Sequence, residues 1–284
     1  MDPTRVEQLK QKYGLSYHIN FAVLAQQLVG LADKRVLEVG GSLPSGLVLD
    51  DLGAQQWLAL EETGYWDETL STGLVLGTPP PLADQRARFK DATRQSLDRH
   101  NLLYGRIEDL PEALHGHFDV VFSIAAFEHI ARLPQALDKM FMALKPGGKL
   151  FSLFSPIWSA HDGHHLPEIK DKAGKQHNFG SSPIPPWGHL LMRPMEMLDH
   201  LLATGCDKDF AREVVYYVYS SNHINRFFLD DFMDIVKRSD FTVAQATPMF
   251  PVQVPQATQA RLEALHPGRS NFSNDGLLLV LERP

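Results

Sequence analysis

The sequence predicts an α/β protein built on a mostly parallel sheet with helices on both faces. Short apolar runs that are typical of strands alternate along the chain with helical patterns of hydrophobic residues. These runs are too uniformly apolar to show the alternation of a half-exposed strand, which indicates a sheet that is covered on both faces. With 284 residues, the chain is long enough for one elaborated domain or for a core domain with a subdomain.

Composition narrows the classes of function. The chain is 44% hydrophobic and 21% charged, which excludes collagen-like, disordered and coiled-coil proteins. A formal net charge of −7 argues against nucleic acid and membrane surfaces as partners. The single cysteine, Cys206, excludes an internal disulfide framework and suits a reducing compartment. Because no apolar leader or spanning stretch is evident, we expect a cytoplasmic protein.

The elements of the core are expected in a regular order. Residues 1–33 are predicted to form an N-terminal helical cap, with helices at 3–12 and 19–31. Strands are then expected at 35–39, 56–60, around 102–104, at 118–123 and at 149–154. A helical pattern runs from Phe127 to Leu144 and closes at the turn Lys145-Pro-Gly-Gly148.

The composition changes after the fifth strand. Residues 155–222 are rich in proline and histidine, and we predict that they are an inserted lid between the fifth strand and its helix. Amphipathic pieces are expected in the insert near 193–205 and 208–219. The core, residues 34–154, resumes over 223–284 with a helix at 227–236, strands at 241–244 and 276–281, and a helical piece at 256–265.

Two acidic residues at strand ends indicate a nucleoside site. Glu38 lies in the first strand, and Glu61 follows the second strand 23 residues later, with Gly40-Gly41-Ser42 between them. In a parallel sheet, ligands bind at the carboxyl ends of the strands, and a carboxylate there can accept hydrogen bonds from both ribose hydroxyls. A glycine turn of this kind is equally compatible with a simple tight loop.

A set of motifs carries a specific resemblance. Val36-Leu-Glu-Val-Gly-Gly41, Ile107-Glu-Asp-Leu-Pro111, Phe118-Asp-Val-Val-Phe-Ser123, Phe127-Glu-His-Ile130 and Leu144-Lys-Pro-Gly-Gly148 occur in this order. Over residues 34–154 and 227–282 the chain thereby resembles the class I S-adenosylmethionine-dependent methyltransferases. The resemblance implies a Rossmann-like, seven-stranded, mostly parallel methyltransferase sheet whose last strand runs antiparallel, and S-adenosylmethionine as the cofactor.

The resemblance also assigns cofactor contacts by position. It places the methionine part of the cofactor near the glycine turn, the ribose on Glu61 and the adenine beside Glu62. Where the family usually has Gly-Asp-Ala after the third strand, this chain has Gly105-Arg106-Ile107, so the acidic contact is lost or moves to Glu108. The implied cofactor-binding residues are Glu38, Gly40, Gly41, Ser42, Glu61, Glu62, Ile107, Glu108 and Ser123.

Two other classes of function compete with methyl transfer. A dinucleotide-dependent oxidoreductase shares the general fold, but Leu43 and Pro44 occupy the place where its helix N-terminus would meet a pyrophosphate. A catalytically silent partner that only binds the cofactor is the second alternative, because the glycine loop departs from the family's Gly-x-Gly-x-Gly.

Histidines are the candidate catalytic residues. Transfer to a hydroxyl requires removal of a proton, and His129 follows the fourth strand close to the expected cofactor site. Glu128-His129 could instead cap or orient the next helix. The related quinone-biosynthesis O-methyltransferases carry one more Glu before this pair and can hold a metal, but the matching residue here is Ala125. His161 is the second candidate base.

The run His161-Asp162-Gly163-His164-His165 has three interpretations: a substrate-binding loop, a solvated turn, or a divalent metal site, which its spacing does not favour. Other aromatic and histidine side chains of the insert are expected either to line an acceptor pocket or to belong to the core of the lid. The predicted substrate-binding residues are Trp158, His164, His165, Trp187 and His189, and no metal ligands are predicted. The expected reaction is methyl transfer to a small polar acceptor, most plausibly a hydroxyl of a sugar or secondary metabolite.

Overall fold

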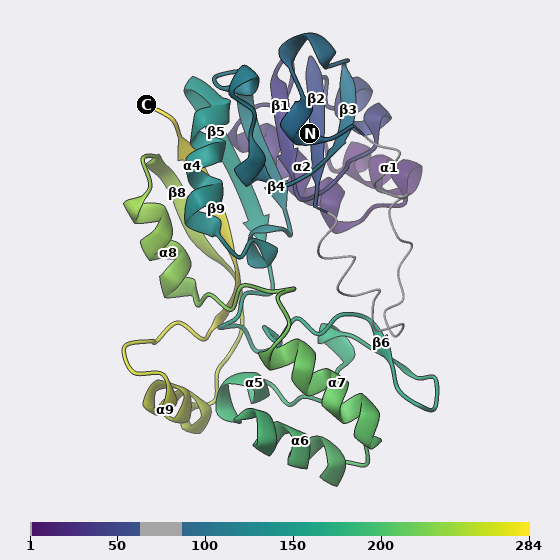
Figure 1. The fold of residues 1–284 in the computed structure, drawn as a ribbon, viewed down its shortest axis with the longest axis vertical. Helices are drawn as coiled ribbons and strands as arrows, with labels where there is room; N and C mark the ends of the chain where they lie inside the picture. The colour runs from purple at the N-terminus through teal and green to yellow at the C-terminus, as the bar shows by residue number, and fades with distance from the viewer. Residues whose placement is uncertain (1, 63–86) are drawn as a thin grey trace.

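The computed structural model describes residues 2–62 and 87–284, and its centre is a seven-stranded sheet (Figure 1). The strand order is β3-β2-β1-β4-β5-β9-β8. The strands are β1 (Arg35–Val39), β2 (Gln56–Glu61), β3 (His100–Tyr104), β4 (Phe118–Ile124), β5 (Leu144–Phe154), β8 (Thr242–Pro251) and β9 (Asn274–Glu282). The pairs among β1 to β5 are parallel, and β9 runs antiparallel to both β5 and β8. The predicted sheet, including its antiparallel last strand, is confirmed.

Helices cover both faces of this sheet. The α-helices that flank the sheet are α1 (Pro3–Tyr13), α2 (Tyr17–Leu28), α4 (Leu133–Ala143) and α8 (Leu229–Arg238). Along β1, Leu37 and Val39 pack into a core with α4 and α8, whereas Val36 packs on the other face with α1 and α2. Because consecutive strand residues point to opposite faces, burial on both sides explains why the strand is apolar without alternation.

Two boundaries differ from the prediction. β5 begins at Leu144, which pairs with Phe118, and the Lys-Pro-Gly-Gly segment expected to be a turn forms a register shift before Lys149 pairs with Val120. Gly147 lies in this segment at φ +75°, a conformation that other residues seldom adopt. After β4, residues Phe127–His129 form a short 3-10 turn, and α4 starts only at Leu133 with a proline in its first turn.

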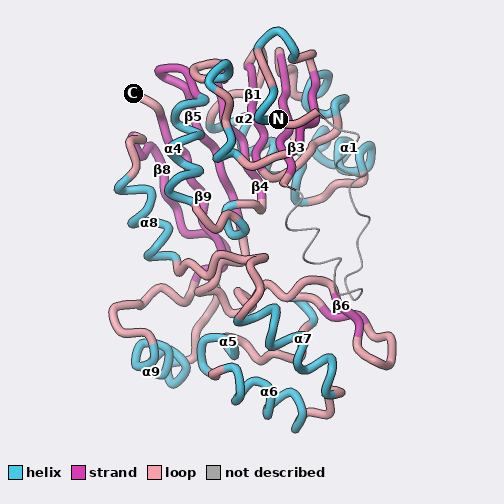
Figure 2. Tube along the Cα trace, in the orientation of Figure 1, coloured by secondary structure: helices cyan, strands magenta, loops and turns pink. Residues whose placement is uncertain are grey.

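The insert that follows β5 forms most of a lower lobe (Figures 1 and 2). Its elements are β6 (Ile169–Lys170), β7 (Gln176–His177), α5 (Gly188–Leu191), α6 (Pro194–Ala203), α7 (Lys208–Tyr219) and, from the later part of the chain, α9 (Gln256–Leu265). These elements bury a separate hydrophobic cluster that includes Trp158 and Tyr217. Leu262 of α9 and Phe272 belong to the same cluster, so part of 223–284 packs with the insert and not with the sheet.

Over residues 2–62 and 87–284, no helix is both long enough and apolar enough to cross a bilayer.

Candidate functional site

A cavity of about 640 Å³ opens at the carboxyl ends of the parallel strands. Val39 and Glu61 end β1 and β2 in its wall, and Gly105 and Ala125 follow β3 and β4. This is the edge where an open α/β sheet binds its ligands. Another cavity, of about 650 Å³, lies in the lower lobe against Asp171 and neighbouring residues, and the residues described there include none of the predicted site residues.

The glycine turn brings the backbone close to this cavity. Gly40 adopts φ +87°, and a Cβ atom built on it would lie 2.2 Å from the Cβ of Ala126. Glycine is therefore required at this position by conformation and by space. Gly41 also lines the cavity. The result is a wall of backbone without side chains, against which a ligand can lie closely.

Glu38 supports the turn from behind and does not itself line the cavity in the part of the chain that the structure describes. Its buried carboxylate accepts hydrogen bonds from the backbone N–H of Leu43 at 3.0 Å and from the indole N–H of Trp57 at 2.6 Å. Burial raises the pKa of Glu38 to about 7, although the two hydrogen bonds oppose this rise. The carboxylate of Glu38 thus orients the glycine turn, and its direct contact with the cofactor stays a prediction.

The two predicted serines have supporting contacts of the same kind. The hydroxyl of Ser42 donates to Glu61 at 2.5 Å, and the buried hydroxyl of Ser123 donates to the carbonyl oxygen of Val39 at 2.8 Å. Neither serine is among the described residues that line the cavity. Each serine instead holds a residue that lines the cavity: Ser42 bonds Glu61 at the end of β2, and Ser123 bonds Val39 at the end of β1.

Glu61 and Glu62 both face the cavity from the end of β2. One Glu61 oxygen accepts from Ser42, and the other accepts from the phenol of Tyr104 at 3.0 Å. Two hydroxyl donors therefore fix the direction of the carboxylate that was predicted to bind ribose. Glu62 pairs with the guanidinium of Arg106 at 2.7 Å.

The loop after β3 supplies a further part of the cavity wall. Ile107 and Glu108 line it, as the sequence predicted, together with Arg106. Glu108 lies 3.7 Å from Arg132, which also lines the cavity and which the sequence analysis missed. Arg132 sits just before α4, where no family motif pointed to it.

His129 lines the opposite end of the same cavity. Its Nδ1 donates to the backbone oxygen of His223, so the lone pair of the neutral ring lies on Nε2. Burial lowers the pKa of His129, which keeps the ring neutral. Asn222 and His223, at the end of the insert, complete this wall. Sequence reasoning missed both, although they lie in the polar run Ser220-Ser221-Asn222-His223 between two helices.

The remaining predicted residues of the insert have structural partners, and none of them lines this cavity within the described chain. Trp158 and Trp187 belong to the core of the lower lobe. His189 donates to the carbonyl oxygen of Trp158 at 2.8 Å, and buried His164 is bonded to the hydroxyl of Ser182 at 3.1 Å. The predicted acceptor contacts of these four residues therefore have no support in the geometry.

His161 and His165 lie apart from each other despite their proximity in sequence. His161 forms a 3.0 Å contact with Asp275 and lies 3.6 Å from Asp162. His165 packs against His129, with ring centroids 4.7 Å apart. Of the two, only His165 reaches the neighbourhood of the cavity.

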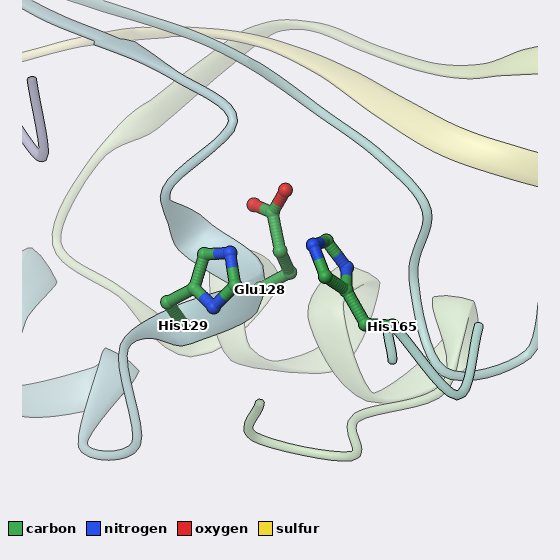
Figure 3. A group of neighbouring side chains, drawn as sticks. All are labelled: Glu128, His129 and His165. Carbon is green, nitrogen blue, oxygen red and sulfur yellow. The ribbon is translucent and has the colours of Figure 1, made fainter. Parts of the chain in front are cut away.

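Glu128 faces the imidazoles of His129 and His165 (Figure 3). The side chain is 1% exposed, and burial raises the pKa of its carboxyl to about 8. The backbone N–H groups of Glu128 and Ser155 offset part of this rise, but neither makes a hydrogen bond of normal geometry with the carboxylate. Glu128, His129 and His165 each offer one ligand atom, and these atoms lie within 4.8 Å of one another.

Comparison with known proteins finds a methyltransferase domain in part of the chain. Residues 77–150 match the family model described as a methyltransferase domain. None of the curated proteins matches the chain. The family match over residues 77–150 and the strand order are those expected of a class I S-adenosylmethionine-dependent methyltransferase, and they favour methyl transfer over the dinucleotide-dependent alternative.

Solved structures resemble the chain at low identity. One is an S-adenosylmethionine-dependent methyltransferase from Mesorhizobium loti, with 14% identity, a TM-score of 0.45 and coverage of 92% of this chain and 96% of that one. Another is a chain of the complex between the Haloferax volcanii Trm112 methyltransferase activator and a methyltransferase. Its identity is 14%, its TM-score is 0.45, and the match covers 99% of this chain and 95% of that one. A third is the YcgJ protein of Bacillus, with 13% identity, a TM-score of 0.42 and coverage of 93% and 96%.

The cavity suits S-adenosylmethionine. The bare backbone at Gly40 and Gly41 provides the close approach that the methionine part needs, since a Cβ on Gly40 would collide with Ala126. At the end of β2, the oriented carboxylate of Glu61 is a suitable acceptor for ribose hydroxyls. Glu62 and Glu108 add further acidic groups to the wall. The glycine backbone and the Glu61 carboxylate therefore fit the methionine and ribose parts of the cofactor.

Proposed function

We propose that this methyltransferase transfers its methyl group to a hydroxyl of a small polar acceptor, such as a sugar or secondary metabolite. The observation that supports the proposal is one cavity with Glu61 in one wall and His129 and His223 in another. When bound, S-adenosylmethionine supplies an electrophilic methyl group: an oxygen–carbon bond forms, the sulfur–carbon bond breaks with its electron pair left on sulfur, and the hydroxyl releases its proton.

His129 is the proposed catalytic residue. Its Nδ1 is engaged by the backbone oxygen of His223, which directs the lone pair of Nε2 away from that carbonyl. A neutral imidazole at this wall can act on an acceptor hydroxyl through that lone pair. His161, the second candidate, has no such support, because it lies against Asp275 and is not among the described residues of the cavity wall.

The insert, residues 155–222, is proposed to cover the acceptor. Asn222 reaches the cavity wall, and His165 is joined to the same wall through a 2.8 Å hydrogen bond that its carbonyl oxygen accepts from His223. These contacts would hold a small molecule near His129.

The proposal is tested by incubating the full chain with S-adenosylmethionine and a panel of acceptors that carry hydroxyl, amine, thiol or carboxylate groups. S-adenosylhomocysteine and methylated product are measured by mass spectrometry. Formation of O-methylated product from a hydroxyl acceptor, in equal amount to S-adenosylhomocysteine, supports the proposal. Methylation of amine or thiol acceptors alone would reject it. Tight cofactor binding with no product from any acceptor would instead favour a catalytically silent partner.

A further inference from the structure

Three side chains at the acceptor end of the cavity form a group that is typical of a metal site. Glu128 and His129 come from the 3-10 turn after β4, and His165 comes from the insert. Figure 3 shows the carboxylate of Glu128 between the two imidazole rings. One ligand atom from each side chain lies within 4.8 Å of the other two.

The carboxylate of Glu128 lacks the partners that a buried carboxylate needs. Both of its oxygens are buried, and neither has a hydrogen-bond partner among residues 2–62 and 87–284. Buried polar groups in native proteins are almost always bonded, because an unpaired one loses its hydration without compensation. A cation between the three side chains would supply the missing interaction for both oxygens.

Both imidazoles are oriented in the way that metal ligands usually are. Nδ1 of His129 donates to the backbone oxygen of His223, and Nδ1 of His165 donates to the backbone oxygen of Pro156 at 3.3 Å. These acceptors assign the tautomer, with the lone pair of each ring on Nε2. A ligating histidine typically donates its other N–H to such a carbonyl, which fixes the ring toward the ion.

The backbone of His165 adds a further sign of a constrained position. His165 adopts φ +47°, a left-handed conformation that is uncommon for residues other than glycine, asparagine and aspartate. Its carbonyl oxygen accepts from His223 at 2.8 Å, and its N–H donates to the carbonyl oxygen of Asp162 at 3.1 Å. The chain thus holds an unfavourable conformation that brings the ring to Glu128, as is common at functional sites.

We infer that Glu128, His129 and His165 together bind one divalent transition-metal ion at the edge of the cofactor cavity. Two imidazoles and one carboxylate suit zinc and its neighbours in the first transition series, and they leave at least one coordination position open. With bonds of about 2.1 Å, a tetrahedral ion holds its ligand atoms about 3.4 Å apart. The present spacing would therefore have to contract by at most about 1.4 Å.

The role of this ion in the reaction rests on the proposed function. Because His129 lines the cavity, an open coordination position would face the acceptor. A hydroxyl oxygen bound there would lose its proton more readily, to solvent, before the oxygen–carbon bond forms. With the ion bound, the lone pair of His129 would act on the hydroxyl through the metal, in place of taking the proton directly.

A second group, His161, Asp162 and Asp275, also has metal-ligand spacing. All three residues are half-buried, and Nδ1 of His161 is already bonded to Asp275 at 3.0 Å. Nδ1 of His161 is therefore taken by a hydrogen bond, unlike Nε2 of the two imidazoles beside Glu128, although Oδ1 of Asp162 has no hydrogen-bond partner among the described residues. The group therefore serves as a matched control in the same protein.

The experiment measures Zn²⁺ binding to the full chain without cofactor or acceptor. Chelator-treated protein is titrated with Zn²⁺ against a competing chelator, and thermal unfolding is followed with and without Zn²⁺. We expect about one tight site per chain and a higher melting temperature with Zn²⁺. Glu128→Gln keeps the side-chain shape, and His165→Asn keeps a residue that tolerates the left-handed backbone. Each is expected to weaken binding at least about 100-fold, beyond the effect of losing a supporting hydrogen bond.

Controls separate the possible outcomes. Asp275→Asn is expected to leave both the zinc affinity and the melting-temperature rise unchanged. Absence of a tight site in the wild-type protein, equal binding by folded Glu128→Gln and His165→Asn, or loss of binding in Asp275→Asn alone would each overturn the inference. Since this assay contains no acceptor, a protein that binds zinc as expected but methylates no hydroxyl would refute the proposed function alone.

Discussion

The ribose assignment of Glu61 gives the sharpest test of the cofactor end of the cavity. In Glu61→Gln, the shape of the side chain is kept and its charge is lost. Ser42 and Tyr104 can still bond it, because hydroxyl groups donate and accept. The fold should therefore survive. Hydrogen bonds to a charged group contribute about 1.5–3 kcal/mol, so the dissociation constant for S-adenosylhomocysteine should rise about 10- to 150-fold.

The assay is isothermal titration, with Glu62→Gln as the matched control. Glu62 also lines the cavity, but its side chain is 42% exposed and pairs with the exposed Arg106. Exposed pairs contribute about 0–1 kcal/mol, so this variant should weaken binding by less than about fivefold. An unchanged dissociation constant in folded Glu61→Gln, or a larger loss in Glu62→Gln, would refute the assignment.

Four further predictions follow from individual contacts. Gly40→Ala should lower the free energy of unfolding by at least about 1–3 kcal/mol in thermal unfolding, because Gly40 has a φ of +87° and the new Cβ would lie 2.2 Å from the Cβ of Ala126. Gly14→Ala is the control and should have a smaller effect, because nothing lies within 4 Å of a Cβ at that position. Burial lowers the pKa of His117 to about 4, so between about pH 6.5 and 4 the unfolded state binds a proton that the folded state does not. The free energy of unfolding that is present above about pH 6.5 should therefore fall by up to about 3 kcal/mol as the pH drops toward 4. In His117→Gln this dependence should flatten, and an equally steep profile would contradict the assignment. His164→Ala should lower the melting temperature and leave the Michaelis constant of the acceptor unchanged, since its ring is buried against Ser182. His129→Gln should lower turnover at least about 100-fold with cofactor affinity unchanged, and near-normal turnover would exclude a catalytic role.

The sheet was predictable because its information is local. Residues 35–39 form β1 with the predicted bounds, since an apolar run that ends at a glycine turn has few other stable conformations. Strand order follows from the family motifs, and strand order brings Glu61 and His129 to one cavity although they are distant in sequence. Residues of the cavity wall such as Glu61 could therefore be predicted from the strand ends together with the family motifs, and their contacts with the cofactor stay predictions.

The insert was not predictable in the same way. Its histidines are close in sequence, but His164 points into the core of the lower lobe, whereas neighbouring His165 packs on His129. The left-handed backbone of His165 produces this divergence, and no local pattern in the sequence indicates it. Composition correctly drew attention to this segment, but only tertiary contacts decide which of its side chains reaches the cavity.

The end of the insert explains how those contacts are fixed. The backbone N–H of Asn225 donates to the carbonyl oxygen of Glu128 at 2.8 Å, and its side-chain amide donates to the carbonyl oxygen of Phe127 at 2.7 Å. His223, two residues earlier, accepts from His129 and donates to His165. The turn after β4 and the insert therefore hold each other, and a displacement of the insert would remove the hydrogen bond that orients His129. Glu128 and His129 could be recognised from the sequence because they lie in one contiguous motif, whereas His165 comes near them only through these tertiary contacts.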